Sequence, residues 1–164
     1  RAACNANSVV PDFLQTGEYK PARAKATLSN AMDVGDPSNF VRILELFDRQ
    51  LGPLKTVVSS ESISDDATID SIRRVYQNDR YLMDPHGAVG WLALQHYLRD
   101  HPGMDGIFLE TAHPVKFSAI VEPVIGEKIP VPPSISALQQ SKRYSVQMEP
   151  DYDFLKKYLY LSDQ

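Results

Sequence analysis

Cysteine is nearly absent from this chain of 164 residues: Cys4 is the only one, so no disulfide can form within the chain. A single free thiol is typical of a reducing compartment, and we expect a cytoplasmic protein. No apolar run approaches the roughly 20 residues that span a bilayer, so we expect no membrane partner. The formal net charge of −4 comes without a basic block, which argues against nucleic acid as a partner.

Three kinds of functional motif are missing as well. The four histidines form no i, i+4 helical pair and have no Cys-x-x-Cys partner, so no metal site is predicted. The G-x-S-x-G sequence of serine hydrolases does not occur. The phosphate loops GxGxxG and GxxxxGK(S/T) do not occur either, so any phosphate cradle lies outside this chain.

The first residues also lack the features of a natural start. The stretch from Arg1 to Asn7 has no initiator methionine and no signal-peptide pattern, and it looks like a strand entered partway along. We therefore expect the sequence to be a piece of a longer protein.

Short apolar runs alternate with helical periodicity along the chain, and this alternation indicates the α/β class. Strands are predicted over residues 2–4, 55–60, 81–83, 106–109 and 144–148. Helices are predicted over residues 9–16, 37–51, 65–76, 86–99, 114–124 and 152–161. The prolines within 129–134 predict an extended connection without regular pairing, after which the last helix can dock on the body.

Capping residues set the predicted helix boundaries. Ser8 can begin the first helix and Gly17 can end it, while Ser64 or Asp65 begins a later one. The pairs Asp36-Pro37 and Asp84-Pro85 combine an N-cap residue with a proline suited to the first helical turn. We expect the helix after Pro37 to run to residue 51 and to end at Gly52-Pro53.

The stretch 106–109 carries no polar side chain and is short, as expected for a strand buried on both faces of a parallel sheet. Thr111 and His113 follow it, where ligands bind at the carboxyl ends of parallel strands. Together with residues 29–39 and 84–87, residues 110–113 make three polar loops at strand ends or helix starts. Such loops can surround a small polar ligand. For residues 106–117, a strand followed by an ordinary turn is the alternative.

Four stretches of the chain share their order and spacing with one known family. They are Ala3-Cys4-Asn5-Ala6-Asn7 with Val10-Pro11-Asp12-Phe13-Leu14; Thr27-Leu28-Ser29-Asn30-Ala31-Met32-Asp33-Val34-Gly35 through Pro37-Ser38-Asn39; Asp84-Pro85-His86 with Ala88-Val89; and Phe108-Leu109 with Thr111-Ala112-His113-Pro114 and Lys116-Phe117. Over residues 2–117 the chain therefore resembles the C-terminal portion of the threonine synthase family, pyridoxal-phosphate enzymes of the tryptophan-synthase-β fold type.

The resemblance implies a partial three-layer α/β sandwich with a mostly parallel sheet flanked by helices, the C-terminal part of a fold-type-II pyridoxal-phosphate enzyme. Residues 1–128 would form the C-terminal part of the large pyridoxal-phosphate domain, incomplete without its N-terminal half. Residues 129–164 would form a proline-rich connection and a C-terminal docking helix.

The resemblance also assigns roles to individual residues. Thr111 would give a hydroxyl to the pyridine nitrogen of pyridoxal 5'-phosphate, leaving that nitrogen largely unprotonated. Asp84 matches a position where related enzymes place a glutamate near the cofactor ring, and helix capping is its alternative role. Ser29 and Asn30 would line the site, and His113 would relay a proton or act as a hinge that orients Thr111.

Asn39 is interpreted as a residue of local loop structure. Glu110 replaces a small residue that some family members carry before the threonine, and the sequence suggests no effect for it.

The family converts O-phospho-L-homoserine and water to L-threonine and phosphate. Its reactive lysine, which holds the cofactor and moves protons, belongs to the N-terminal half, and no lysine of this chain stands in the matching motif. We therefore expect no catalytic residue in this chain, an inert fragment, and the N-terminal half of the same protein as its partner. Two alternatives stay open: a phospho-lyase that releases a keto acid from the same substrate, and a non-catalytic α/β interaction module.

Overall fold

A computed structural model describes residues 1–139, 141–142 and 144–162. They form two compact units, Arg1–Pro130 and Val131–Gln164. In these described ranges no helix is both long enough and apolar enough to cross a membrane.

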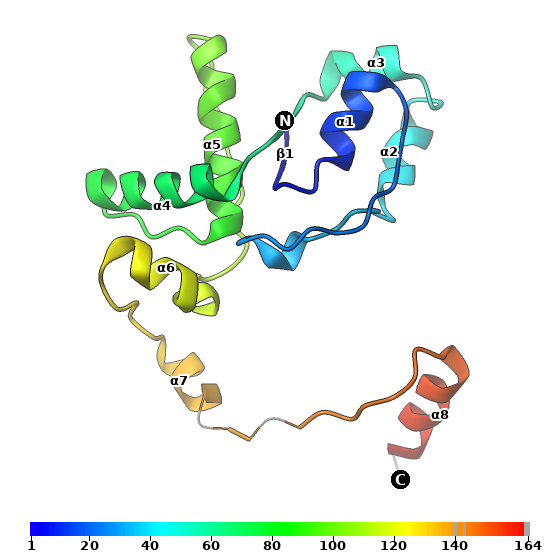
Figure 1. Cartoon of the computed structure of the whole chain (residues 1–164), viewed down its shortest axis with the longest axis vertical. Coiled ribbons are helices and arrows are strands. Elements are labelled where there is room, and N and C mark those ends of the chain that lie inside the picture. The colour runs from blue at the N-terminus through cyan, green and yellow to red at the C-terminus, as the bar shows by residue number, and fades with distance from the viewer. Residues whose placement is uncertain (140, 143, 163–164) are drawn as a thin grey trace. The chain divides into compact units, whose positions relative to one another are not determined.

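The first unit is built around a short parallel sheet with helices about it (Figure 1). Strand β1 (Ala2–Cys4) pairs with β2 (Ser60–Ser62), with Ala3 opposite Glu61. Between the strands the chain forms α1 (Val9–Thr16), η1 (Asn30–Met32), α2 (Phe40–Leu46) and α3 (Leu51–Val57), and after β2 it forms α4 (Asp65–Asp79), α5 (Pro85–Asp100), η2 (Pro114–Phe117) and α6 (Ser118–Ile125). The predicted α/β class, with a parallel sheet flanked by helices, is confirmed.

Two apolar clusters hold this unit together. Helices α1, α2 and α3 meet at the buried side chains Phe13, Leu14, Phe40 and Leu54. Helix α5 contributes Val89, Leu92 and Ala93 to a second cluster with Ile63, directly after β2. Helix α4 packs on α5, and α5 packs on β1, so the first turn of α5 is held near the carboxyl end of β1.

The predicted caps explain where several helices begin and end. Ser64 Oγ accepts a hydrogen bond from the backbone N–H of Ala67 at 3.3 Å, at the start of α4. Asp84 caps α5 in the same way, with Pro85 as its first residue. Gly17 ends α1 with φ of 79°, a backbone conformation that suits glycine. These three predictions are confirmed.

The single helix predicted over 37–51 is wrong. Helix α2 begins only at Phe40 and stops at Leu46, and Asp48 and Arg49 adopt positive φ angles of 51° and 56°. The chain changes direction at these two residues. This turn allows α3 to place Leu54 in the core, where its side chain is 1% exposed. Gly52-Pro53 does not end a helix, because Pro53 lies in the first turn of α3, where its missing N–H has no intrahelical partner to lose.

Three predicted strands are wrong. Residues 55–57 belong to α3, and the strand forms later, at Ser60–Ser62. Residues 81–83 have no regular structure, although the Met83 side chain is fully buried. Residues 106–109 are extended but unpaired, with Ile107 91% and Leu109 78% exposed. A strand needs a hydrogen-bonding neighbour, and within the described residues the sheet has only two strands.

The second unit contains α7 (Pro133–Gln139) and α8 (Tyr152–Ser162). The predicted terminal helix is confirmed. The extended connection predicted over 129–134 is wrong from Pro133 onward, because a proline is well suited to begin a helix. The strand predicted over residues 144–148 is also wrong, because these residues have no regular structure.

Candidate functional site

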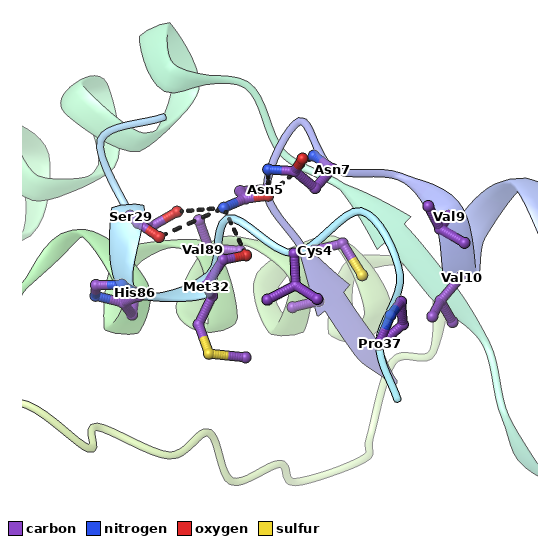
Figure 2. A pocket seen from close by; sticks show the side chains of 12 residues that line it. Cys4, Asn5, Asn7, Val9, Val10, Ser29, Met32, Pro37, His86 and Val89 are labelled. Atoms are coloured by element: carbon purple, nitrogen blue, oxygen red, sulfur yellow. Dashed lines mark hydrogen bonds between the residues drawn. The ribbon is translucent and has the colours of Figure 1, made fainter. Parts of the chain in front are cut away.

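A buried network of polar side chains begins where β1 ends. Asn5, at 6% exposure, donates through Nδ2 to Thr27 Oγ1 at 2.9 Å and to Ser29 Oγ at 3.0 Å. Its Oδ1 accepts from the backbone N–H and the side-chain amide of Asn7, both at 2.9 Å. Figure 2 shows Asn5 between Ser29 and Asn7. Asn5 therefore fixes the loop that precedes η1 against the end of the strand.

Asp33 fixes the same loop from its other end. Its Oδ1 accepts from the Thr27 hydroxyl at 2.6 Å, and its Oδ2 accepts from the Thr27 backbone N–H at 3.0 Å. Asn7 extends the network to Lys25, whose backbone N–H and carbonyl both bond to the Asn7 amide. Since nearly every polar atom here has a partner, the loop has one defined shape.

A cavity of about 220 Å³ lies beside this network (Figure 2). Its walls come from β1, α1, the loop around η1 and the first turns of α5, including Cys4, Asn5, Ser29, Met32, His86 and Val89. Most of the wall is apolar, with a few polar groups at one side, as in small-molecule sites.

A second cavity of about 530 Å³ shares Ala3, Met32 and His86 with the first. Its other walls include Phe108 and Thr111 from the extended segment after α5. The two cavities are therefore neighbours that share part of their walls. The first lies at the carboxyl end of β1, beside Cys4 and Asn5, where parallel sheets bind ligands, whereas the second extends along α5 past Arg1 and Ala3.

Two acidic side chains meet at the start of α5. Asp84 is completely buried, and its Oδ1 accepts from the backbone N–H groups of His86 at 2.6 Å and Gly87 at 2.8 Å. Glu110 Oε1 accepts from the backbone N–H of Asp84 at 3.0 Å. The remaining oxygens, Asp84 Oδ2 and Glu110 Oε2, are buried without a hydrogen-bond partner. Both ring nitrogens of His86 are likewise buried without one, although Nδ1 lies 3.4 Å from Asp84 Oδ1.

Burial changes the acidity of two groups around the cavities. It raises the pKa of Glu110, and the Asp84 carboxylate adds to the rise while the Asp84 N–H acts in the opposite direction. Burial also raises the pKa of the Cys4 thiol, and the Asp12 carboxylate adds to the rise. The cavity wall at Cys4 is therefore a poor place for a thiolate nucleophile.

The structure brings together part of the predicted site. Ser29, at 3% exposure, lines the first cavity, and Thr111 lines the second. Asn30 is exposed and lines neither cavity. Asp84 lies behind the cavity walls as a helix cap, and His113 is exposed and caps η2 by accepting from the Val115 N–H at 3.1 Å.

Sequence reasoning missed the residues that shape the cavities. Asn5 and Asn7 carry only the general signal of polar groups after a strand. Asp33 lies in a loop rich in small polar residues, and the sequence places His86 at the start of a helix. Several of their contacts join residues far apart in the sequence, as with the 24 positions that separate Asn5 from Ser29. Among the described residues, no three His, Cys, Asp or Glu side chains are grouped to hold a metal ion.

Comparison with known proteins points in one direction. Residues 87–159 match a family model described as "Threonine synthase, C-terminal". A threonine synthase of Haemophilus influenzae is 40% identical over 158 residues, and one of Serratia marcescens is 38% identical over the same length; each match covers 96% of this chain. The chain spans 36% of the length of each of these relatives.

Solved structures agree with the sequence matches. The crystal structure of threonine synthase from Escherichia coli aligns with a TM-score of 0.82 and 37% identity over 99% of this chain, which is 37% of that structure. A pyridoxal-phosphate-bound threonine synthase from Brucella melitensis has the same fold, with a TM-score of 0.72 at 24% identity over 96% of this chain and 39% of its own. In sequence and in fold, the chain corresponds to the C-terminal portion of threonine synthases.

Proposed function

We propose that this chain is the C-terminal part of a threonine synthase, a pyridoxal-phosphate-dependent lyase that converts O-phospho-L-homoserine and water to L-threonine and phosphate. The observation that carries the proposal is the alignment with the Escherichia coli enzyme over 99% of the chain. A cytoplasmic location is part of the proposal, supported by the single cysteine.

The two neighbouring cavities suit part of a cofactor site. Thr111 lies on the larger one, and we propose that its hydroxyl contacts the pyridine nitrogen of pyridoxal phosphate. Ser29 lies on the smaller one, held by Asn5, and we propose that it contacts substrate or cofactor. The cofactor, when bound, withdraws electrons from the substrate carbon atoms, while the residues of this chain orient the ring and exclude water.

The other predicted residues take less direct parts in this proposal. Asp84 holds the first turn of α5, and with it His86, in place beside both cavities. His113 fixes the turn after Thr111 through its bond to Val115. Asn30 is exposed in this chain, and we propose that it contacts the substrate only after the rest of the protein has closed the site.

We further propose that the rest of the same protein supplies the opposite wall. Ile107 and Leu109 are exposed, whereas Phe108 and Glu110, which alternate with them, are half-buried, and this is the alternation of a strand at a sheet edge. A strand from the N-terminal half would pair there and cover the apolar side chains. Residues 1–128 would then complete a large domain with that half, followed by the connection and docking helix of 129–164.

The test uses the full-length protein. We expect threonine and phosphate as products from O-phospho-L-homoserine, and we expect Thr111→Ala to weaken pyridoxal-phosphate binding or turnover by about tenfold, the scale of a lost hydrogen bond to a charged or strongly polar ring. A matched control is Thr56→Ala, because Thr56 lies on the exposed side of α3 and donates only to the backbone carbonyl of Pro53.

The products also separate the alternatives. Release of a keto acid would identify a phospho-lyase on the same scaffold. Failure of the full-length protein to bind pyridoxal phosphate would favour a non-catalytic module and overturn the proposal. The 164-residue chain by itself should form no threonine.

A further inference from the structure

Among the described residues, one hydrogen bond ties the extended segment before Thr111 to the rest of its unit. It is the bond from the Asp84 N–H to Glu110 Oε1, which joins residues 105–112 to another element. The side chains on either side of this tie, Leu109 and Thr111, are exposed. Glu110 therefore supplies the hydrogen bond that holds the backbone next to Thr111, in addition to the packing of Phe108 beside Gly90.

Gly87 shows how tightly the Glu110 carboxyl group is seated. A Cβ atom added at Gly87 would lie 1.9 Å from Glu110 Oε2 and 2.4 Å from its Cδ, far inside contact distance. Gly87 is not at a positive φ angle and lies in the first turn of α5, so its backbone conformation does not require glycine. The carboxyl group of Glu110 therefore explains this glycine, which backbone geometry does not.

We propose that Glu110 is a positioning residue: its carboxyl group fills the space left by Gly87, ties the Thr111 segment to the N-terminus of α5, and thereby sets the place of the Thr111 hydroxyl toward the cofactor. The inference deepens the proposed function, because the effect on the cofactor rests on Thr111. Its physical logic is also electrostatic, since a carboxyl group at a helix N-terminus accepts from a free N–H group. Asp84 caps the same turn through different N–H groups, so the two acids divide the available donors between them.

The first experiment measures the dissociation constant of pyridoxal phosphate for the full-length protein. Glu110→Ala should weaken binding about fivefold, the effect of one lost hydrogen bond, whereas Glu110→Gln should stay within about twofold because its amide oxygen can still accept from Asp84. Glu149→Ala, at an exposed position of the second unit, is the control and should change nothing. Equal binding by the wild-type protein and Glu110→Ala would overturn the inference.

The second experiment separates positioning from general stability. If Glu110 acts through Thr111, then Glu110→Ala should add almost nothing to the loss already caused by Thr111→Ala. Fully additive losses in the double variant would show that Glu110 acts independently of the threonine, against the proposal.

The third experiment tests the Gly87 contact without any cofactor. In the full-length protein, Gly87→Ala should lower the midpoint of thermal unfolding. The double variant Gly87→Ala/Glu110→Ala should recover most of this loss, because the obstructing carboxyl group is gone. A double variant that is no more stable than Gly87→Ala would contradict the contact. Should Gly87→Ala fail to fold, recovery of a folded protein in the double variant gives the same answer.

The three results keep the inference distinct from the proposed function. A full-length protein that binds no pyridoxal phosphate would defeat the proposed function, and with it the cofactor part of the inference. The thermal comparison of the Gly87 variants would still test the contact between Gly87 and Glu110.

Discussion

Asn5 is the residue on which the first cavity depends most. Its amide joins the end of β1 to Thr27, Ser29 and the backbone of Asn7, all within buried or partly buried surroundings. A buried polar group that loses its partner costs roughly 1–3 kcal/mol, and several groups around Asn5 would lose theirs together.

We therefore expect Asn5→Ala to lower the free energy of unfolding by about 2 kcal/mol or more. Urea denaturation of the chain measures the change. The control is Asn30→Ala in the same loop, which should stay within about 0.5 kcal/mol because Asn30 is exposed. Equal stabilities for the two variants would contradict the structural role given to the network.

Glu110 predicts a dependence of stability on pH. Burial raises its pKa in the folded chain, so the folded state holds its proton more tightly than the unfolded state. The contribution of Glu110 to the free energy of unfolding should then be largest at low pH. It should be lost as pH rises from the ordinary pKa of glutamate through the raised pKa of the folded chain.

In Glu110→Gln this contribution to the pH dependence should disappear. Denaturation of both proteins between about pH 4 and pH 8 checks it, with wild type losing stability relative to Glu110→Gln as pH rises. A constant difference between the two proteins across that range would show that the Glu110 carboxyl group does not titrate as described.

At the scale of elements, Ser8 and Ser64 both directly precede a helix, but only one of them makes a capping hydrogen bond. Ser64 accepts from the Ala67 N–H at the start of α4. Ser8 precedes α1 but makes no capping bond, and its hydroxyl instead donates to Asp12 on the exposed surface at 2.9 Å.

Ser64→Ala should therefore destabilise the chain by about 1 kcal/mol, the usual value of an N-cap, while Ser8→Ala should stay within about 0.5 kcal/mol. Thermal or urea denaturation compares the two directly. A larger effect at Ser8 than at Ser64 would contradict the assignment of the caps.

The elements also show where local patterns fail. The sequence from Phe40 to Leu51 has good helical spacing, yet Asp48 and Arg49 break it because Leu54 must reach the core beside Phe13. Tertiary packing outweighs helix propensity here, since one buried leucine contributes more than a few helical residues. Capping signals such as Asp84-Pro85 succeeded because they act within one helical turn.

At the scale of the whole molecule, the main feature is the exposed apolar segment 106–109. Ile107 at 91% and Leu109 at 78% exposure are unusual for an apolar run that reads as a buried strand. If the N-terminal half covers these side chains, their contribution depends on whether that half is present.

The double change Ile107→Ser/Leu109→Ser should therefore alter the stability of the isolated chain by less than about 1 kcal/mol. In the full-length protein it should cost several kcal/mol, because each buried aliphatic side chain contributes about 1.5–3 kcal/mol. Thermal denaturation of both lengths makes the comparison, with the exposed Leu46→Ser as control. A full-length double variant with an unchanged midpoint would show that nothing covers this segment.

The sequence by itself determined the features that act over short distances: the α/β alternation, the caps at Ser64 and Asp84, and the family resemblance that includes Thr111. Only the tertiary structure decided that Ser29 is buried and Asn30 exposed, that 106–109 is unpaired, and that Glu110 is seated against Gly87. The physical reason is separation along the chain. A cap or a strand pattern is complete within a few neighbouring residues, whereas the contacts of Asn5 with Ser29 and of Asp84 with Glu110 join residues 24 and 26 positions apart.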